Sequence, residues 1–201
     1  MCISPHLEYR DRNTEAKDLF KFRKKSKTVF RLMSDYLSQI SMNQHERWMA
    51  LALAQANFAK DKNEVPVGAI LVDCDSMEVV AEAHNESISN NDPTAHAEIV
   101  VLRKAAAIRQ NYRLPRTAIY VTIEPCTMCV GAMYHSRVDA VIFGAKEPRA
   151  GALVSQICLA EKSFYNHRLD ILGGVLEDQC ATVISNFFKG RRFDTEKEHV
   201  F

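Results

Sequence analysis

Apolar residues recur at helical spacing in some stretches of this chain and run almost without interruption in others. After residue 41, the first such stretch predicts a helix over 42–60. The apolar face of this helix is formed by Trp48, Leu51, Ala52 and Ala56. Two apolar runs follow at 65–73 and 78–84, and the polar pair Asp75-Ser76 between them predicts a β-hairpin.

A further helix is predicted to begin at Asp92-Pro93, because Asp is a favoured N-cap and Pro fits the first helical position. Its buried stripe is formed by Ala95, Ile99, Leu102 and Ala106. Beyond it, strands are predicted over 117–123, 138–144 and near 169–175, and helices from about Pro125, near 152–161 and near 177–191. Helices alternating with strands favour the α/β class, as a three-layer α/β/α sandwich.

Residues 1–41 differ from the rest and are predicted to form a basic N-terminal extension, partly helical over about 14–39. Residues 1–40 hold nine Lys/Arg against five Asp/Glu, including the run KFRKKSK at 21–27. A mitochondrial transit peptide is one interpretation, although such peptides are poor in acidic residues. Two other interpretations are an accessory helix and sequence that lies upstream of a true start at Met42. The main domain is predicted to span 42–201.

Composition restricts the class of protein. Apolar residues make up 47% of the 201 residues and charged residues 25%, with a formal net charge of +1. This balance is typical of a globular protein, and any nucleic-acid contact must come from local basic clusters. The sequence has no apolar run long enough to span a membrane and no secretory signal, so a cytoplasmic location is expected and the six cysteines are not expected to pair.

Residue types that bind a catalytic metal occur in three short pieces of the sequence, which are His96-Ala97-Glu98, Pro125-Cys126 and Cys129. His96 and Glu98 lie near a predicted helix start, and Cys126 and Cys129 lie at i and i+3 in the first turn of another helix. A helix N-terminus favours the thiolate form that a metal needs. One imidazole and two thiolates predict a three-ligand zinc site whose fourth position is left for water. Glu98 is predicted to be the carboxylate that moves protons beside it.

Each of these segments has a plainer interpretation when it is taken alone. A lone CxxC is often half of a structural zinc site or a redox pair, and a lone histidine or glutamate is usually structural or solvated. The combination H-A-E followed by P-C-x-x-C resembles the signature of the zinc-dependent nucleobase deaminases. These enzymes replace the exocyclic amino group of a base by hydrolysis.

The segments around this signature resemble the bacterial-type tRNA-specific adenosine deaminases over about 42–192. They are EVPVGAI (64–70), Asn85, NDPTAHAEI (91–99), NYRL (111–114), YVTIEPCTMCVGAMYHSR (120–137), FGAK (143–146), NHR (166–168) and SNFFKGRR (185–192). The resemblance implies a cytidine-deaminase-like fold with a mixed five-stranded sheet, and one Zn²⁺ per subunit of a homodimer. The implied reaction converts adenosine to inosine at the wobble position of a tRNA anticodon loop.

The resemblance also implies roles for residues around the zinc site. Asn85 is expected to hydrogen-bond the flipped nucleoside, in a pocket shaped by Val67 and Ile123. Where the family commonly has Ala-Arg-Asp after Phe-Gly, this chain has Ala145-Lys146-Glu147. The acidic group expected to face the substrate ribose is therefore Glu147, which is one methylene longer.

The expected RNA contacts lie mainly in the last predicted helix. Adjacent phenylalanines cannot both face a core squarely, so one of Phe187 and Phe188 is free to stack on a loop base. Phe188 is the candidate for stacking, and the candidates for phosphate contact are Lys189, Arg191, Arg192 and Arg149. Solvated charge beside a plain core is the competing interpretation of this segment.

Two other functions remain open from the sequence. A free-base or free-nucleoside deaminase of the guanine or cytidine type would use the same metal and the same carboxylate. It would not need the basic aromatic segment at 185–192. A catalytically inactive RNA-binding subunit built around a structural zinc would have no use for Glu98.

Overall fold

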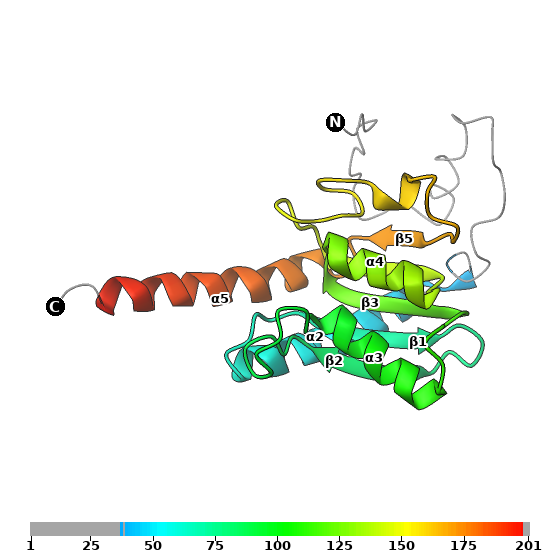
Figure 1. The fold of residues 1–201 in the computed structure, drawn as a ribbon. Helices are drawn as coiled ribbons and strands as arrows, with labels where there is room; N and C mark the ends of the chain where they lie inside the picture. The colour runs from blue at the N-terminus through cyan, green and yellow to red at the C-terminus, as the bar shows by residue number, and fades with distance from the viewer. Residues whose placement is uncertain (1–36, 38, 199–201) are drawn as a thin grey trace.

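The computed structural model describes Leu37 and residues 39–198, which form one sheet with helices on both of its faces (Figure 1). In chain order the elements are α2 (Met42–Asp61), β1 (Gly68–Asp73), β2 (Val79–His84), α3 (Ala97–Arg109), β3 (Thr117–Ile123), α4 (Thr127–Ser136), β4 (Ala140–Ala145), η2 (Leu159–Glu161), β5 (Asp170–Gly173) and α5 (Glu177–Glu198). The helix predicted over 14–39 lies outside the described residues, apart from Leu37 and Gln39.

The sheet has five strands in the order β2-β1-β3-β4-β5. β1 pairs antiparallel with both β2 and β3, whereas β3, β4 and β5 run parallel to one another. The predicted hairpin and the predicted mixed five-stranded sheet are therefore confirmed. β4 is buried along its whole length and β3 is buried up to Ile123, as expected of central strands covered on both faces.

Two hydrophobic cores, one on each face of the sheet, make the fold a three-layer α/β/α sandwich. α3 and α4 pack over one face, with Ile119, Val121 and Val141 pointing into that core. α2 packs over the other face, joined by the start of α5. The predicted layer architecture is confirmed, and α5 projects well beyond the sheet (Figure 1).

The predicted helix start at Asp92-Pro93 is wrong, because α3 begins five residues after Asp92. The Asp92 carboxylate accepts hydrogen bonds from the backbone N–H of Thr94 at 2.8 Å and from its hydroxyl at 2.7 Å. Asp92 therefore closes a short turn instead of capping a helix. The N-cap of α3 is His96, which follows this turn and lies at the helix N-terminus.

Other boundaries also differ from the prediction. α4 begins at Thr127 with Cys126 as its N-cap, so Pro125 precedes the helix. No α-helix forms near 152–161, where the structure has turns and the three-residue helix η2. The backbone N–H groups of Leu153, Val154 and Ser155 are bound by a side chain from a distant segment, as described below. α5 continues to Glu198, beyond its predicted end at 191.

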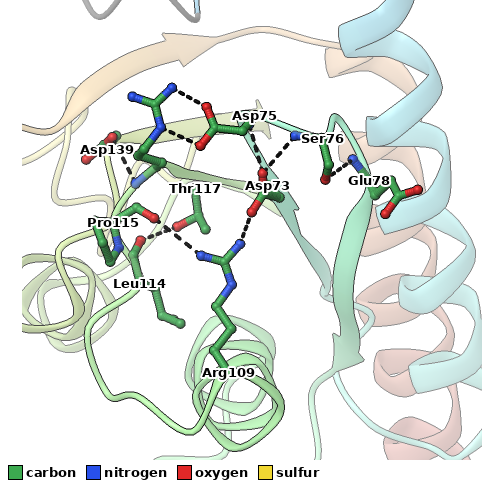
Figure 2. Close-up of polar contacts among 10 residues, drawn as sticks. Asp73, Asp75, Ser76, Glu78, Arg109, Leu114, Pro115, Thr117 and Asp139 are labelled. Carbon is green, nitrogen blue, oxygen red and sulfur yellow. Dashed lines mark hydrogen bonds and ion pairs between the residues drawn. The ribbon is translucent and has the colours of Figure 1, made fainter.

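Charged side chains close the end of the sheet where β1 finishes and β3 starts (Figure 2). The Asp73 carboxylate accepts hydrogen bonds from the backbone N–H groups of Asp75 and Ser76, and it pairs with Arg109 of α3. Arg116 pairs with Asp75 at the hairpin turn. These contacts connect the hairpin to α3 and to the start of β3. The candidate metal centre described below lies at the opposite end of β3.

None of the helices in residues 39–198 is both long and apolar enough to cross a membrane.

Candidate metal centre

The three predicted metal ligands come together at the end of β3, between two helix N-termini. His96 is the N-cap of α3, Cys126 is the N-cap of α4, and Cys129 lies in the first turn of α4. The side chain of Cys129 is buried, and those of His96 and Cys126 are half-buried. Within the described part of the chain, these residues form the one group of His, Cys, Asp or Glu side chains placed to share an ion.

The spacing of the three ligand atoms tests whether they fit zinc. His96 Nδ1 lies 3.8 Å from Cys126 Sγ and 3.6 Å from Cys129 Sγ, and the two Sγ atoms are 3.7 Å apart. Tetrahedral zinc, with its usual bond lengths to sulfur and nitrogen, requires separations of about 3.6–3.8 Å between such atoms. The donor set and its geometry therefore both fit a zinc ion.

The surroundings favour the thiolate form of Cys126, whereas the hydrogen bond to Cys126 and burial raise the pKa of Cys129. The pKa of Cys126 is lowered to about 4, because the Cys129 thiol and then the His96 imidazole hydrogen-bond to its sulfur. The hydrogen bond to Cys126 in turn raises the pKa of His96. Both cysteines also lie at the N-terminus of α4, where the helix dipole stabilises negative charge.

Glu98 lies beside this triad but outside the ligand group. It is in the first turn of α3, is 3% exposed, and its carboxyl group contacts the Cys129 thiol. Burial raises the pKa of Glu98. A carboxyl group in such surroundings can both accept and release protons, which suits a general acid and base.

Asn85 follows β2 directly and reaches the start of α3. Its side-chain oxygen accepts a hydrogen bond from the backbone N–H of Ala97 at 3.0 Å, between His96 and Glu98. Its own backbone N–H donates to the carbonyl of Val67 at 3.0 Å. Asn85 and Val67 are buried, and Ile123 is partly buried at the end of β3. The three residues predicted to surround the nucleoside therefore lie near the C-terminal end of β3.

Glu147 lies on the loop that follows β4. Its carboxylate accepts a hydrogen bond from the backbone N–H of Arg149 at 2.8 Å, and its own backbone N–H donates to Glu124 at 3.2 Å. Glu124 was not among the predicted site residues, although it directly precedes Pro125-Cys126. The sequence feature that could have indicated Glu124 is its position as an acidic residue directly after the largely apolar strand β3.

The basic aromatic segment lies on the projecting part of α5. Phe188 is 45% exposed, whereas Phe187 is half-buried. Arg191 stacks over the Phe187 ring and donates to the carbonyl of Asn63 at 2.8 Å. Lys189 is exposed, as is Arg149 on its own loop, and the Arg192 side chain lies outside the described part of the structure. Arg191 is therefore bound to the body of the protein, while Phe188 and Lys189 face solvent.

Comparison with known families matches most of this domain. A family model described as the cytidine and deoxycytidylate deaminase zinc-binding region matches residues 42–145. A tRNA-specific adenosine deaminase of Haemophilus influenzae is 44% identical over 153 residues, which are 76% of this chain and 88% of the relative. One of Bacillus subtilis is 39% identical over 151 residues, covering 75% of this chain and 92% of the relative.

Solved structures agree with this comparison. One from a study of A-to-I editing by tRNA:A34 deaminases at the wobble position of transfer RNA has a TM-score of 0.66 and 38% identity. It covers 68% of this chain and 98% of the solved chain. A guanine deaminase from Nitrosomonas europaea has a TM-score of 0.60 at 20% identity, covering 71% and 83% of the two chains. The second similarity shows the shared fold alone.

Proposed function

The chain belongs to the cytidine and deoxycytidylate deaminase family, among its tRNA-specific adenosine deaminases, and we propose that it hydrolyses adenosine to inosine at the wobble position of a tRNA anticodon loop. The observation that carries the reaction class is the His96-Cys126-Cys129 triad with the buried Glu98 beside it. The identity to tRNA-specific relatives along most of the domain supports the substrate class.

The proposed cofactor is one Zn²⁺ per subunit, held by His96, Cys126 and Cys129. When bound, zinc supplies a water of lowered pKa at neutral pH, which is the nucleophile that hydrolytic deamination requires. The measured separations of the three donor atoms support this assignment. Cys126 is already held toward its thiolate form, whereas the pKa values of Cys129 and His96 are raised, so zinc binding displaces protons mainly from these two ligands.

Glu98 performs the proton transfers of the proposed reaction. Its carboxylate accepts a proton from the attacking water and delivers it to N1 of the purine as the new C6–O bond forms. Glu98 then takes the second proton from the new hydroxyl group on C6 and passes it to the amino group. The C6–N bond breaks as the C6=O bond forms, and the amino group leaves as ammonia. The products are inosine and ammonia, and Glu98 returns to its starting state. Its burial keeps the proton affinity high enough for both transfers.

Asn85 and its neighbours orient the nucleoside in the proposed complex. The hydrogen bond from Ala97 uses the Asn85 oxygen, so the Nδ2 group is the part that can donate to the substrate. Val67 and Ile123 supply apolar walls, and Glu147 is proposed to accept from the ribose. A base in a single-stranded anticodon loop reaches such a pocket at low unstacking cost.

The RNA is proposed to extend from this pocket toward Arg149 and α5, where Phe188 stacks on a loop base and Lys189 meets phosphate. Arg191 and Arg192 remain proposed phosphate contacts, although Arg191 already binds Asn63. The homodimer, the cytoplasmic location and the domain boundary at residue 42 also stay predictions. Light scattering of the purified full chain tests the dimer directly.

Inosine formation on an anticodon stem-loop with adenosine at the wobble position tests the proposal. Nucleoside mass spectrometry of zinc-loaded protein is expected to find inosine from the stem-loop and none from free adenosine. A stem-loop with guanosine at the wobble position is the matched negative control. If zinc-loaded protein leaves the stem-loop unchanged but deaminates guanine or cytidine, the chain is a small-molecule deaminase. If it acts on none of these substrates, a binding subunit is the better description.

A further inference from the structure

A carboxylate that the proposed mechanism does not use lies directly behind the metal centre. Glu124 precedes Pro125 and Cys126 and is 2% exposed. Its Oε1 accepts hydrogen bonds from the backbone N–H groups of Leu153, Val154 and Ser155, at 3.1, 2.8 and 2.9 Å. Its Oε2 accepts from the backbone N–H of Glu147 at 3.2 Å and from the Ser155 hydroxyl. One side chain therefore accepts five hydrogen bonds from the segment 147–155.

All five donors belong to the loop that carries Glu147 and Arg149. The loop also pairs with the metal-ligand segment through an isolated antiparallel bridge between Gly151 and Cys126, which includes the hydrogen bond from Ala152 N–H to the Pro125 carbonyl at 2.9 Å. A Cβ atom at Gly151 would overlap the Glu124 carboxyl group. The loop is thus packed tightly against Glu124, with no room for a larger side chain at its closest approach.

Five converging donors require an acceptor with two oxygens. Backbone N–H groups that point into one space form an anion-binding concavity, and a buried carboxylate satisfies them without a cationic partner. A glutamine at position 124 would turn its amide N–H groups toward some of these donors. With its oxygen in the place of Oε1, such a glutamine would lose the hydrogen bond from the backbone N–H of Glu147, while the sheet and the two ligand helices would keep theirs.

We infer that Glu124 is a positioning residue, which holds the loop 147–155 so that Glu147 meets the ribose of the substrate. This inference rests on the proposed function. Glu124 acts through the loop and touches neither the ligand atoms nor the proposed path of the protons. It links the segment that binds the metal to the segment that recognises the nucleoside, so that both are placed by one carboxylate.

The test compares Glu124→Gln with wild type by steady-state kinetics on the anticodon stem-loop. We expect KM to rise by about tenfold while kcat and the zinc content stay within a factor of about three. Hydrogen exchange should increase at the amides of the 147–155 loop and not in α3 or α4. Glu161→Gln makes the same chemical change at an exposed position and should match wild type.

A double-mutant cycle with Glu147→Gln separates positioning from general destabilisation. If Glu124 acts through Glu147, the second substitution adds little to the KM of the first. Fully additive effects, or a fall in kcat with unchanged KM, would overturn the inference. The milder Ser155→Ala removes one of the five donors and should raise KM by a few-fold, even if Glu124→Gln does not fold. A wild type without activity refutes the proposed function, whereas an active wild type with an unaltered Glu124→Gln refutes the positioning role alone.

Discussion

The side-chain oxygen of Asn85 accepts a hydrogen bond from the backbone N–H of Ala97, at 3.0 Å. Ala97 is the first residue of α3 and lies between His96, the proposed metal ligand, and Glu98, the proposed proton carrier. The bond satisfies one of the N–H groups that a helix N-terminus leaves free. It also sets the orientation of the Asn85 amide, so that Nδ2 remains for the substrate.

This orientation predicts unequal roles for the two ends of the Asn85 amide. Asn85→Asp keeps an acceptor for Ala97 and replaces the donor, whereas Asn85→Ala removes both. We expect kcat/KM on the stem-loop to fall by about 10- to 100-fold in Asn85→Asp, with zinc content and melting temperature close to wild type. Asn85→Ala should be as slow and also less stable. Activity of Asn85→Asp at the wild-type level would show that Nδ2 does not donate to the substrate.

Substitution of Glu98 is expected to stop turnover without removing the metal. Glu98→Ala leaves His96, Cys126 and Cys129 intact but deletes the buried carboxyl group beside them. We expect inosine formation to fall by at least about 10²- to 10⁴-fold. Metal analysis of the same preparation should find zinc at the wild-type ratio. Glu46→Ala, at an exposed position of α2, is the control. Loss of zinc from Glu98→Ala would mean that this residue serves the metal site instead.

Removal of one thiolate ligand is expected to remove both metal and activity. Cys129→Ser substitutes a hydroxyl group that ionises poorly, at a buried position in the first turn of α4. We expect bound zinc to fall from about one equivalent to a small fraction of one, with loss of inosine formation. In the wild type, a chelator should give the same loss, and added zinc should reverse it. Cys158→Ser, away from the triad, should keep its zinc. Full zinc content in Cys129→Ser would refute the ligand assignment.

Much of the fold and of the candidate site could be predicted from the spacing of neighbouring residues in the sequence. The strand 117–123 was predicted with its observed bounds, because a central strand covered on both faces is apolar almost throughout. Cys126 and Cys129 were predictable as neighbours, because they lie at positions i and i+3 of one helix start.

Features that depend on a side chain binding backbone N–H groups could not be predicted from residue spacing. The segment 152–161 has helical spacing but does not form an α-helix, since Glu124 binds its backbone N–H groups from about thirty residues away. The start of α3 shifted because the Asp92 side chain bonded to Thr94 and closed a turn. In both cases a carboxylate competed for backbone N–H groups, which residue spacing does not reveal.

Phe188 and Lys189 are expected to contribute to RNA binding in different ways. Both are exposed on α5, whereas the neighbouring Phe187 is half-buried under Arg191. Phe188→Ala should raise KM for the stem-loop by about 5- to 100-fold, which is the usual range for loss of one stacked base. Lys189→Ala should reduce the slope of log affinity against log salt concentration by about one, as expected when one phosphate contact is lost. Steady-state kinetics measure the effect of Phe188→Ala on KM, and binding titrations at several salt concentrations measure the slope. Phe187→Leu tests whether any change in this helix has the same result. Unchanged binding in Phe188→Ala would favour a purely solvated end of α5.

His45 predicts a dependence of stability on pH that is independent of the site. Its ring is buried against Tyr120, with Nδ1 2.8 Å from the Tyr120 hydroxyl, and burial lowers its pKa from 6.5 to about 4. As the pH falls below about 6.5, the unfolded chain therefore binds a proton that the folded protein does not. The free energy of unfolding should decrease from pH 6.5 toward pH 4. At pH 5 the loss attributable to His45 is at most about 2 kcal/mol.

The matched variant for this effect is His45→Asn, which places a polar amide near the Tyr120 hydroxyl but does not titrate. Urea unfolding of both proteins between pH 5 and pH 8 isolates the contribution of His45, because other titrating groups are common to the pair. The difference in unfolding free energy should be constant above about pH 7 and shift in favour of the variant as the pH falls. Parallel profiles across the whole range would show that His45 has the same pKa in the folded and unfolded states, which would contradict the lowered pKa.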